Sequence, residues 1–156
     1  MPRIPFNTKG ERPQIGIYSY GNIQPQDFAG QFEFDVSTLR DPAGQQQFKG
    51  MNGLYPEVRD WVGSDRRVSI IIKDILLLSD DMAKPKAKEG KSTPEPISPY
   101  VSFSFKDHHG KWISPAIAEL VADVLIKEGF RVAVHHRGIV PADRPAGYPA
   151  DGTTSA

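Results

Sequence analysis

Short apolar runs with a period of two alternate along the chain with longer stretches that repeat every three to four residues. A period of two predicts β-strands and a period near 3.6 predicts helices. The alternating runs lie at 14–20, 31–36, 100–105 and 130–136. The helical pattern covers 56–62, 64–78 and 114–128. The run Ile70-Ile71-Ile72 leaves a buried strand open as the alternative for the second helix.

End signals support these helices. Pro56 suits the first turn of a short helix, and Ser64-Asp65 can cap the next one. In the third, we expect Ser114 as the N-cap, Pro115 at the first helical position, and Gly129 in the left-handed conformation after the last turn.

The order strand, helix, strand over residues 100–136 predicts a parallel βαβ unit. We therefore expect an α/β protein: a single compact domain with a mostly parallel sheet flanked by helices. Residues 14–140 would form this domain, between a flexible N-terminal arm at 1–13 and a disordered tail at 141–156. The segment 83–99, rich in Lys, Pro and Ser, predicts a mobile surface loop, because it cannot bury enough apolar area to offset its ordering entropy.

Composition excludes several classes. The chain has 156 residues, 38% hydrophobic and 24% charged, which is enough for one ordinary core. Its formal net charge is zero, so nucleic acid would need a local basic surface. It has no cysteine, which excludes thiolate nucleophiles and cysteine zinc sites. It shows no apolar stretch near twenty residues and no signal peptide, so we expect a cytoplasmic protein without a membrane partner.

The junction between the third strand and the third helix is the best candidate site. Ligands bind outside the carboxyl ends of parallel strands, and the start of a helix favours anions. If the last two strands are neighbours, both of their ends border one crevice, and main-chain amides near Ser114 would cradle a phosphate or phosphosugar. The side chains and glycine predicted there are His108, His109, Gly110, Lys111, Ser114, His136 and Arg137, with Asp35 and Asn22 at other strand ends.

Other chemistries fit the sequence less well. The stretch "HGKW" is not a P-loop, since Phe105 stands where its first glycine would be and Trp112 where its Ser/Thr would be. Adjacent histidines cannot easily share one metal ion, and no HExxH spacing exists, so we expect no metal and no cofactor. No GxSxG motif appears.

The segment 100–139 resembles the end of the C-terminal domain of the RNase adapter protein RapZ. The family's strand, Gly-Lys loop and helix start are kept in Gly110, Lys111, Ser114 and 116–119, and its strand end in His136-Arg137. Upstream, "FDVSTLRDP" at 34–42 and "MNGL" at 51–54 are also similar to the family. The resemblance covers about 14–140 and implies this fold, without the family's N-terminal P-loop domain.

The resemblance also implies a pocket for an amino-sugar phosphate or similar anion, and RNA binding. Several positions depart from the family pattern. Asp107, His108 and His109 replace Cys, Thr and Gly, Trp112-Ile113 replaces His-Arg, Ser37 replaces Arg, and Asn22 replaces a histidine. Loss of the loop arginine removes a bidentate phosphate contact, which Lys111 cannot reproduce.

We therefore predict a binding domain that does no chemistry and takes a phosphorylated small molecule, RNA or both. RNA would use a basic surface and an aromatic stack from Trp61 or Trp112. The basic residues predicted for RNA are Lys84, Lys86, Lys88, Lys91, Arg66 and Arg67. Two alternatives stay open: a protein-interaction module with a decayed pocket, which includes a homo-oligomer, and a histidine-dependent phosphoester hydrolase.

Overall fold

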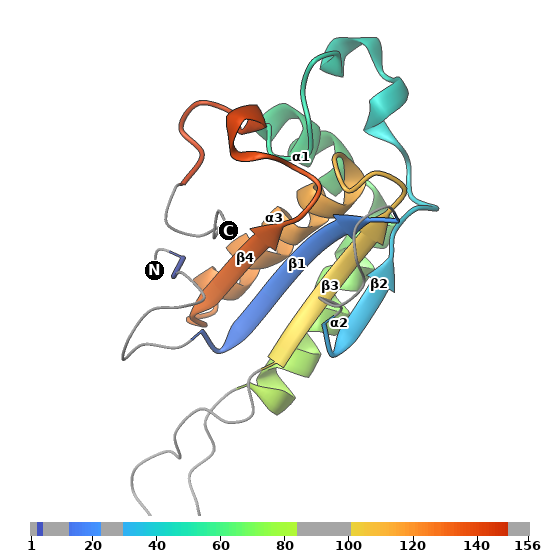
Figure 1. Ribbon diagram of the computed structural model, residues 1–156. Helices are drawn as coiled ribbons and strands as arrows, with labels where there is room; N and C mark the ends of the chain where they lie inside the picture. Colours follow the sequence, from blue (N-terminus) through green and yellow to red (C-terminus); the bar gives the residue numbers. More distant parts are fainter. Residues whose placement is uncertain (1–2, 5–12, 23–29, 84–100, 150–156) are drawn as a thin grey trace, which may run out of the picture.

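The computed structural model describes residues 3–4, 13–22, 30–83 and 101–149. Within them, one parallel sheet of four strands has the order β2-β3-β1-β4. The strands are β1 (Ile15–Gly21), β2 (Phe32–Asp35), β3 (Val101–Asp107) and β4 (Val132–His136). The helices α1 (Pro56–Gly63), α2 (Arg66–Met82) and α3 (Ile113–Lys127) lie on one face of the sheet (Figure 1). This confirms the predicted α/β fold and the parallel C-terminal βαβ unit.

Three short 3₁₀ turns complete the described secondary structure. Two of them, Pro42–Gly44 and Gln46–Phe48, lie in the stretch between β2 and α1, where the sequence predicted no regular element. The third, Pro141–Asp143, follows β4. Across the described part of the chain, none of the helices is long and apolar enough to cross a membrane.

The strand β1 lies in the middle of the sheet, between β3 and β4. Ser19 of β1 is in register with Phe105 on one side and with His136 on the other. The ends of β3 and β4 are therefore not neighbours, and the premise of one crevice directly between them is wrong. The crossover from β3 through α3 passes over β1, as long crossovers in parallel sheets can do.

Alternation along the strands decides which side chains face the helices. Ile15 and Ile17 of β1 and Phe103 and Phe105 of β3 are fully buried and belong to one core with α3. Ser19 and Asp107 continue the same two rows toward the carboxyl ends of their strands. The helix-facing rows thus end in polar groups at the sheet edge that carries the predicted site.

The helix boundaries agree with the capping signals in two of three cases. Pro56 opens α1, and Asp65 caps α2, where its carboxylate accepts the N–H of Arg67 at 3.0 Å. The strand alternative for 70–72 is wrong, because α2 runs through these residues. The third helix starts two residues earlier than predicted: Ser114 is already inside α3, whose first residue is Ile113 and whose N-cap position is Trp112.

Two described residues near the ends of the chain contact helix α3. Arg3, expected in a flexible arm, is buried and ion-paired to Glu119 of α3. Tyr148, expected in a disordered tail, donates its hydroxyl to the same carboxylate at 3.0 Å. Residues 5–12 and 150–156, and the predicted loop 83–99 apart from Ala83, lie outside the described residues.

Candidate functional site

The loop that joins β3 to α3 is organised around the buried carboxylate of Asp107. One oxygen accepts the N–H groups of His109, at 3.1 Å, and Gly110. The other oxygen accepts the N–H of Ser114, in the first turn of α3, at 3.0 Å. A carboxylate at a helix start satisfies free amide donors and interacts favourably with the helix dipole. The protein's own side chain thus takes up the amides that the sequence analysis assigned to a bound anion.

Three glycines from other segments pack against this loop, backbone to backbone. A Cβ atom on Gly21 would lie 2.4 Å from the carbonyl carbon of His109, and one on Gly138 would lie 2.3 Å from the carbonyl oxygen of Gly110. On Gly53 it would lie 2.2 Å from the carbonyl oxygen of Trp112. The amide of Gly53 also donates to the carbonyl of Lys111 at 2.8 Å. The loop is therefore held in one place from three sides.

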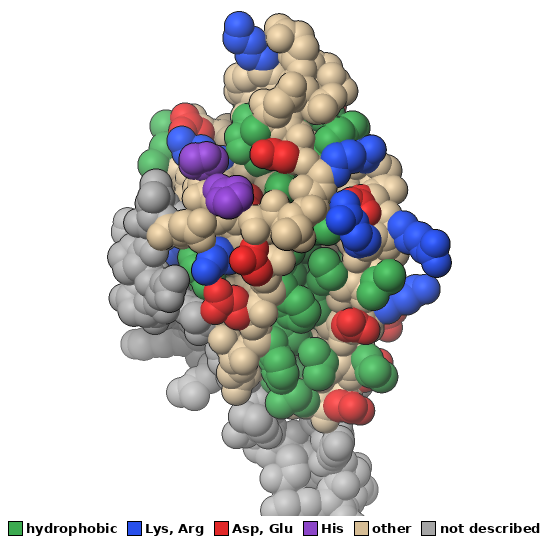
Figure 2. All heavy atoms as spheres, turned by 90° about the vertical axis from the view of Figure 1, so that its right-hand side faces the viewer, with side chains coloured by type: hydrophobic (Ala, Val, Ile, Leu, Met, Phe, Trp, Pro, Cys, Tyr) green, Lys and Arg blue, Asp and Glu red, His purple; other side chains and the backbone are tan. Residues whose placement is uncertain are grey.

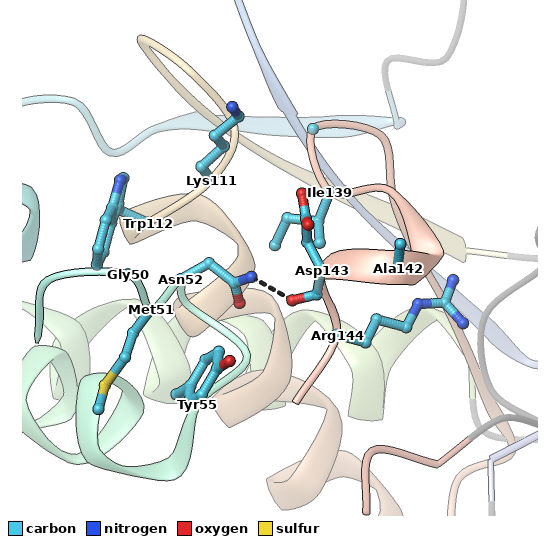
Figure 3. A pocket seen from close by; sticks show the side chains of 11 residues that line it. Gly50, Met51, Asn52, Tyr55, Lys111, Trp112, Ile139, Ala142, Asp143 and Arg144 are labelled. Carbon is cyan, nitrogen blue, oxygen red and sulfur yellow. Dashed lines mark hydrogen bonds between the residues drawn. The ribbon is translucent and has the colours of Figure 1, made fainter. Parts of the chain in front are cut away.

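A pocket of about 490 Å³ opens beside this loop, at the carboxyl edge of the sheet. Three segments line it: 50–55 before α1, Lys111 and Trp112 of the loop, and 138–144 after β4 (Figure 3). Figure 3 shows Lys111 and Trp112 on one side and Asp143 and Arg144 on the other. Predicted and unpredicted residues thus meet at the location that parallel α/β sheets use for ligands.

The pocket wall combines fixed polar groups with aromatic rings. The buried Asn52 donates its amide to the carbonyl of Asp143 at 2.7 Å, and its side-chain oxygen accepts the N–H of Leu54 at 3.0 Å. This bridge joins two of the three segments. Arg144 lies over the ring of Tyr148, 5.5 Å from its centre. Tyr55 and Trp112 add two aromatic rings to the lining.

The histidines of the loop lie outside this lining. His108 and His109 are exposed, and the amide nitrogen of Asn22 lies 3.5 Å from Nδ1 of His108. Asp35 is exposed on the neighbouring strand β2; its pKa is lowered mainly by hydrogen bonds from the hydroxyl and amide of Ser37, and less by nearby cations. The residues predicted for the anion site therefore do not lie together. Asn22 and His108 lie close to each other at the surface, and of the predicted residues only Lys111 lines the pocket.

His136 belongs to a buried network. Its Nδ1 lies 2.6 Å from the hydroxyl of Ser19, and its Nε2 lies 2.7 Å from a carboxylate oxygen of Glu119. An ionised carboxylate only accepts hydrogen bonds, so the proton on this side belongs to Nε2. Ser19 and His136 are register partners on β1 and β4, and Glu119 reaches them from α3. This histidine is buried and does not line the pocket.

Glu119 is the centre of that network. Burial alone would raise its pKa, but the hydrogen bond and charge of His136, together with Arg3, hold the pKa at about 2. The hydroxyl of Tyr148 and, at 3.8 Å, the guanidinium of Arg59 also face this carboxylate. Sequence reasoning missed Glu119. At helical spacing, Glu119 lies beside Asp123 and on the side of the helix opposite Ile117, Val121 and Leu125, so the sequence carried no signal that its side chain would be buried.

The remaining predicted residues are Gly110 and Arg137 of the anion site and the basic residues predicted to bind RNA. Gly110 has a positive φ of 70° and packs under Gly138, and Arg137 donates its amide to the carbonyl of Ser19 at 2.8 Å. Arg66 and Arg67 are exposed at the start of α2, where Arg67 pairs with Asp65 at 2.8 Å. The lysines predicted for RNA lie outside the described residues: Lys84, Lys86, Lys88 and Lys91.

Together, the fold and the pocket define a small parallel α/β domain with a polar, cation-bearing pocket at its carboxyl edge. Residues 13–140 match the RapZ C-terminal domain family, and the chain belongs to it. This confirms the resemblance drawn from the loop and helix motifs.

Curated relatives agree with this assignment. A nucleotide-binding protein of Ruegeria sp. is 26% identical over 132 residues, which cover 85% of this chain and 42% of the relative. A nucleotide-binding protein of Solibacter usitatus is 29% identical over 141 residues, 88% of this chain and 41% of the relative. The chain therefore spans about two-fifths of the length of these relatives.

Proposed function

We propose that this domain binds a phosphorylated small molecule, of the sugar-phosphate or nucleotide type, in the pocket beside the β3–α3 loop. The observation that carries the proposal is that Lys111 and Arg144, from two different segments, both line one pocket of about 490 Å³. A volume of this size suits a small ligand.

Different residues of the pocket lining suit different parts of such a ligand. Lys111 and Arg144 supply positive charge for a phosphate, and arginine offers the planar fork that suits phosphate oxygens. Tyr55 and Trp112 offer flat apolar surface for a sugar ring or a base. The carboxylate of Asp143 can accept hydrogen bonds from sugar hydroxyls. The loop amides of His109, Gly110 and Ser114 already donate to the carboxylate of Asp107. We therefore expect side chains to bind the ligand's anionic group.

The relatives are named as nucleotide-binding proteins, which supports a nucleotide as one of the ligands proposed here. They are full proteins of more than twice the matched length, so their binding is carried over only as a proposal. RNA binding, self-association and a cytoplasmic location stay predictions. The hydrolase alternative is weakened, because no histidine of the described residues lines the pocket.

The test is calorimetric titration of the wild-type protein with inorganic phosphate, glucose 6-phosphate, glucosamine 6-phosphate, AMP and, as the uncharged control, glucose. We expect one phosphorylated ligand to bind and glucose to fail. Lys111→Met should weaken binding by about 10- to 100-fold, the value of one charge-assisted contact. Lys73→Met, which removes an exposed lysine from the middle of α2, is the matched control and should bind as wild type.

Failure of every phosphorylated ligand, or equal binding by Lys111→Met, would contradict the proposal. A short structured RNA in the same panel, titrated at two salt concentrations, separates the RNA prediction, because phosphate-backbone contacts weaken steeply as salt rises. Release of inorganic phosphate from p-nitrophenyl phosphate would favour the hydrolase instead.

A further inference from the structure

A second hollow lies away from the pocket, between the edge strand β2 and helix α2. Its volume is about 550 Å³, and its lining is mostly apolar. Figure 2 shows apolar side chains gathered on this face, with acidic and basic side chains around them. The residues that line this β2–α2 groove are Gln31, Phe32, Glu33, Phe34, Asp74, Leu77 and Leu78.

Several large apolar side chains here are open to solvent. Leu77 is 65% exposed, and Ile70, seven residues earlier and therefore on the same side of α2, is 52% exposed. On β2, the rings of Phe32 and Phe34 stack on Phe103 and Phe105 of β3 but are only partly buried. Contiguous apolar surface of this kind usually marks an interaction site.

The sheet also ends here. Among the described strands, β2 pairs with β3 and with nothing on its other side. An edge strand offers outward N–H and C=O groups to which another strand can add. A strand added to β2 would extend the sheet over α2, and every second side chain would point to the groove beside Leu77 and Leu78.

The charged side chains of β2 and α2 indicate which side chains such an added strand must have. The side chains of β2 that alternate with the two phenylalanines are Glu33 and Asp35, both exposed. Asp74 lines the groove from the α2 side, and none of the described lysines and arginines lines it. Cross-strand neighbours of opposite charge stabilise a sheet, and like charges oppose pairing. A second copy paired through its own β2 would bring the same acidic residues together, which disfavours that occupant.

We infer that β2 and α2 form a docking site for an extended segment of a partner protein in which apolar residues alternate with lysine or arginine. The apolar residues fill the groove against Phe34 and Leu77, and the basic residues lie beside Glu33 and Asp35. This inference does not depend on the small-molecule pocket, whose lining shares no residue with the groove.

The probe is a fluorescent hexapeptide of alternating valine and lysine, followed by anisotropy. Two further peptides serve as controls: one with glutamate in place of lysine, and one with three lysines followed by three valines. We expect the alternating Val/Lys peptide to bind at least tenfold more tightly than either control. Leu77→Asp should weaken its binding at least tenfold, whereas Val140→Asp, at an equally exposed apolar position outside the groove, should leave it unchanged.

Equal binding of the three peptides, or unchanged binding by Leu77→Asp, would overturn the inference. So would failure of the Val/Lys peptide to bind at millimolar concentration. Sedimentation equilibrium adds a last outcome: a dimer that forms with concentration and is abolished by Leu77→Asp would assign the groove to a second copy of the chain and overturn the partner proposed here.

Discussion

The carboxylate of Asp107, at the end of β3, lies 3.0 Å from the amide nitrogen of Ser114, in the first turn of α3. The strand thus ends in a charge that caps the helix seven residues later in the chain. This contact fixes the loop between them, and the loop in turn presents Lys111 and Trp112 to the pocket. The N-terminus of a helix favours an anion, and at α3 the carboxylate of Asp107 already fills this role.

Replacement of this carboxylate by an amide should destabilise the protein. Asp107→Asn keeps the size of the side chain but removes the charge and leaves a buried N–H facing another donor. We expect a loss of about 1–3 kcal/mol in the free energy of unfolding, measured by urea denaturation. Asp41→Asn is the control, because Asp41 caps a 3₁₀ turn in the same way at an exposed position. Equal losses in the two variants would contradict the role given to Asp107.

Close packing of backbone around the loop predicts a second effect. Gly21→Ala and Gly138→Ala each place a methyl group within 2.4 Å of main-chain atoms of His109 or Gly110, so the loop must move. We expect each change to cost about 1–3 kcal/mol of unfolding free energy, by thermal or chemical denaturation. Gly44→Ala meets nothing within 4 Å and should be close to neutral. A neutral result for both loop-facing glycines would show that the loop is not clamped.

Periodicity and capping signals were sufficient for most of the fold. The alternating runs became β1 to β4, and Pro56 and Asp65 begin helices as predicted. The order of the strands was not accessible in the same way, because β1 enters the middle of the sheet through contacts distant in sequence. The start of α3 was also missed, since the cap comes from Asp107 in a preceding strand rather than from Ser114 beside the helix.

The sequence predicted the region of the candidate pocket, but only one of the site residues it predicted, Lys111, lines that pocket. Placing it at the β3–α3 junction relied on a general property of parallel sheets, and a pocket is present there. Asn52 and Arg144 were missed because their segments reach this edge through the tertiary fold. His136 was included because its type suits catalysis and anion binding, but its partners Ser19 and Glu119 bury it.

The buried carboxylate of Glu119 predicts a specific acid sensitivity. Its pKa in the folded protein, about 2, lies below the ordinary value of a glutamate. A lowered pKa stabilises the fold above the unfolded-state pKa, and this contribution is lost as the pH falls from about 4.5 to about 2. The loss should be on the order of 3 kcal/mol, measured by urea denaturation at several pH values.

Glu119→Gln provides the comparison for this pH profile. The variant should be less stable than wild type at pH 7, because a buried charge partner of Arg3 and His136 is removed. Its stability should also fall less between pH 4.5 and 2. If the wild type and Glu119→Gln lose the same stability over this range, Glu119 is not ionised in the fold.

The most direct test of the central claim is a two-dimensional ¹⁵N NMR titration of the wild-type protein with the phosphorylated ligand that binds most tightly in calorimetry. We predict that the indole N–H of Trp112 and the amides of Lys111, Asn52, 138–140 and 142–144 shift together and saturate with one affinity. Shifts confined to Asn22, His108 and His109, on the other side of the loop, or no saturable shift at all, would contradict the assignment of the pocket.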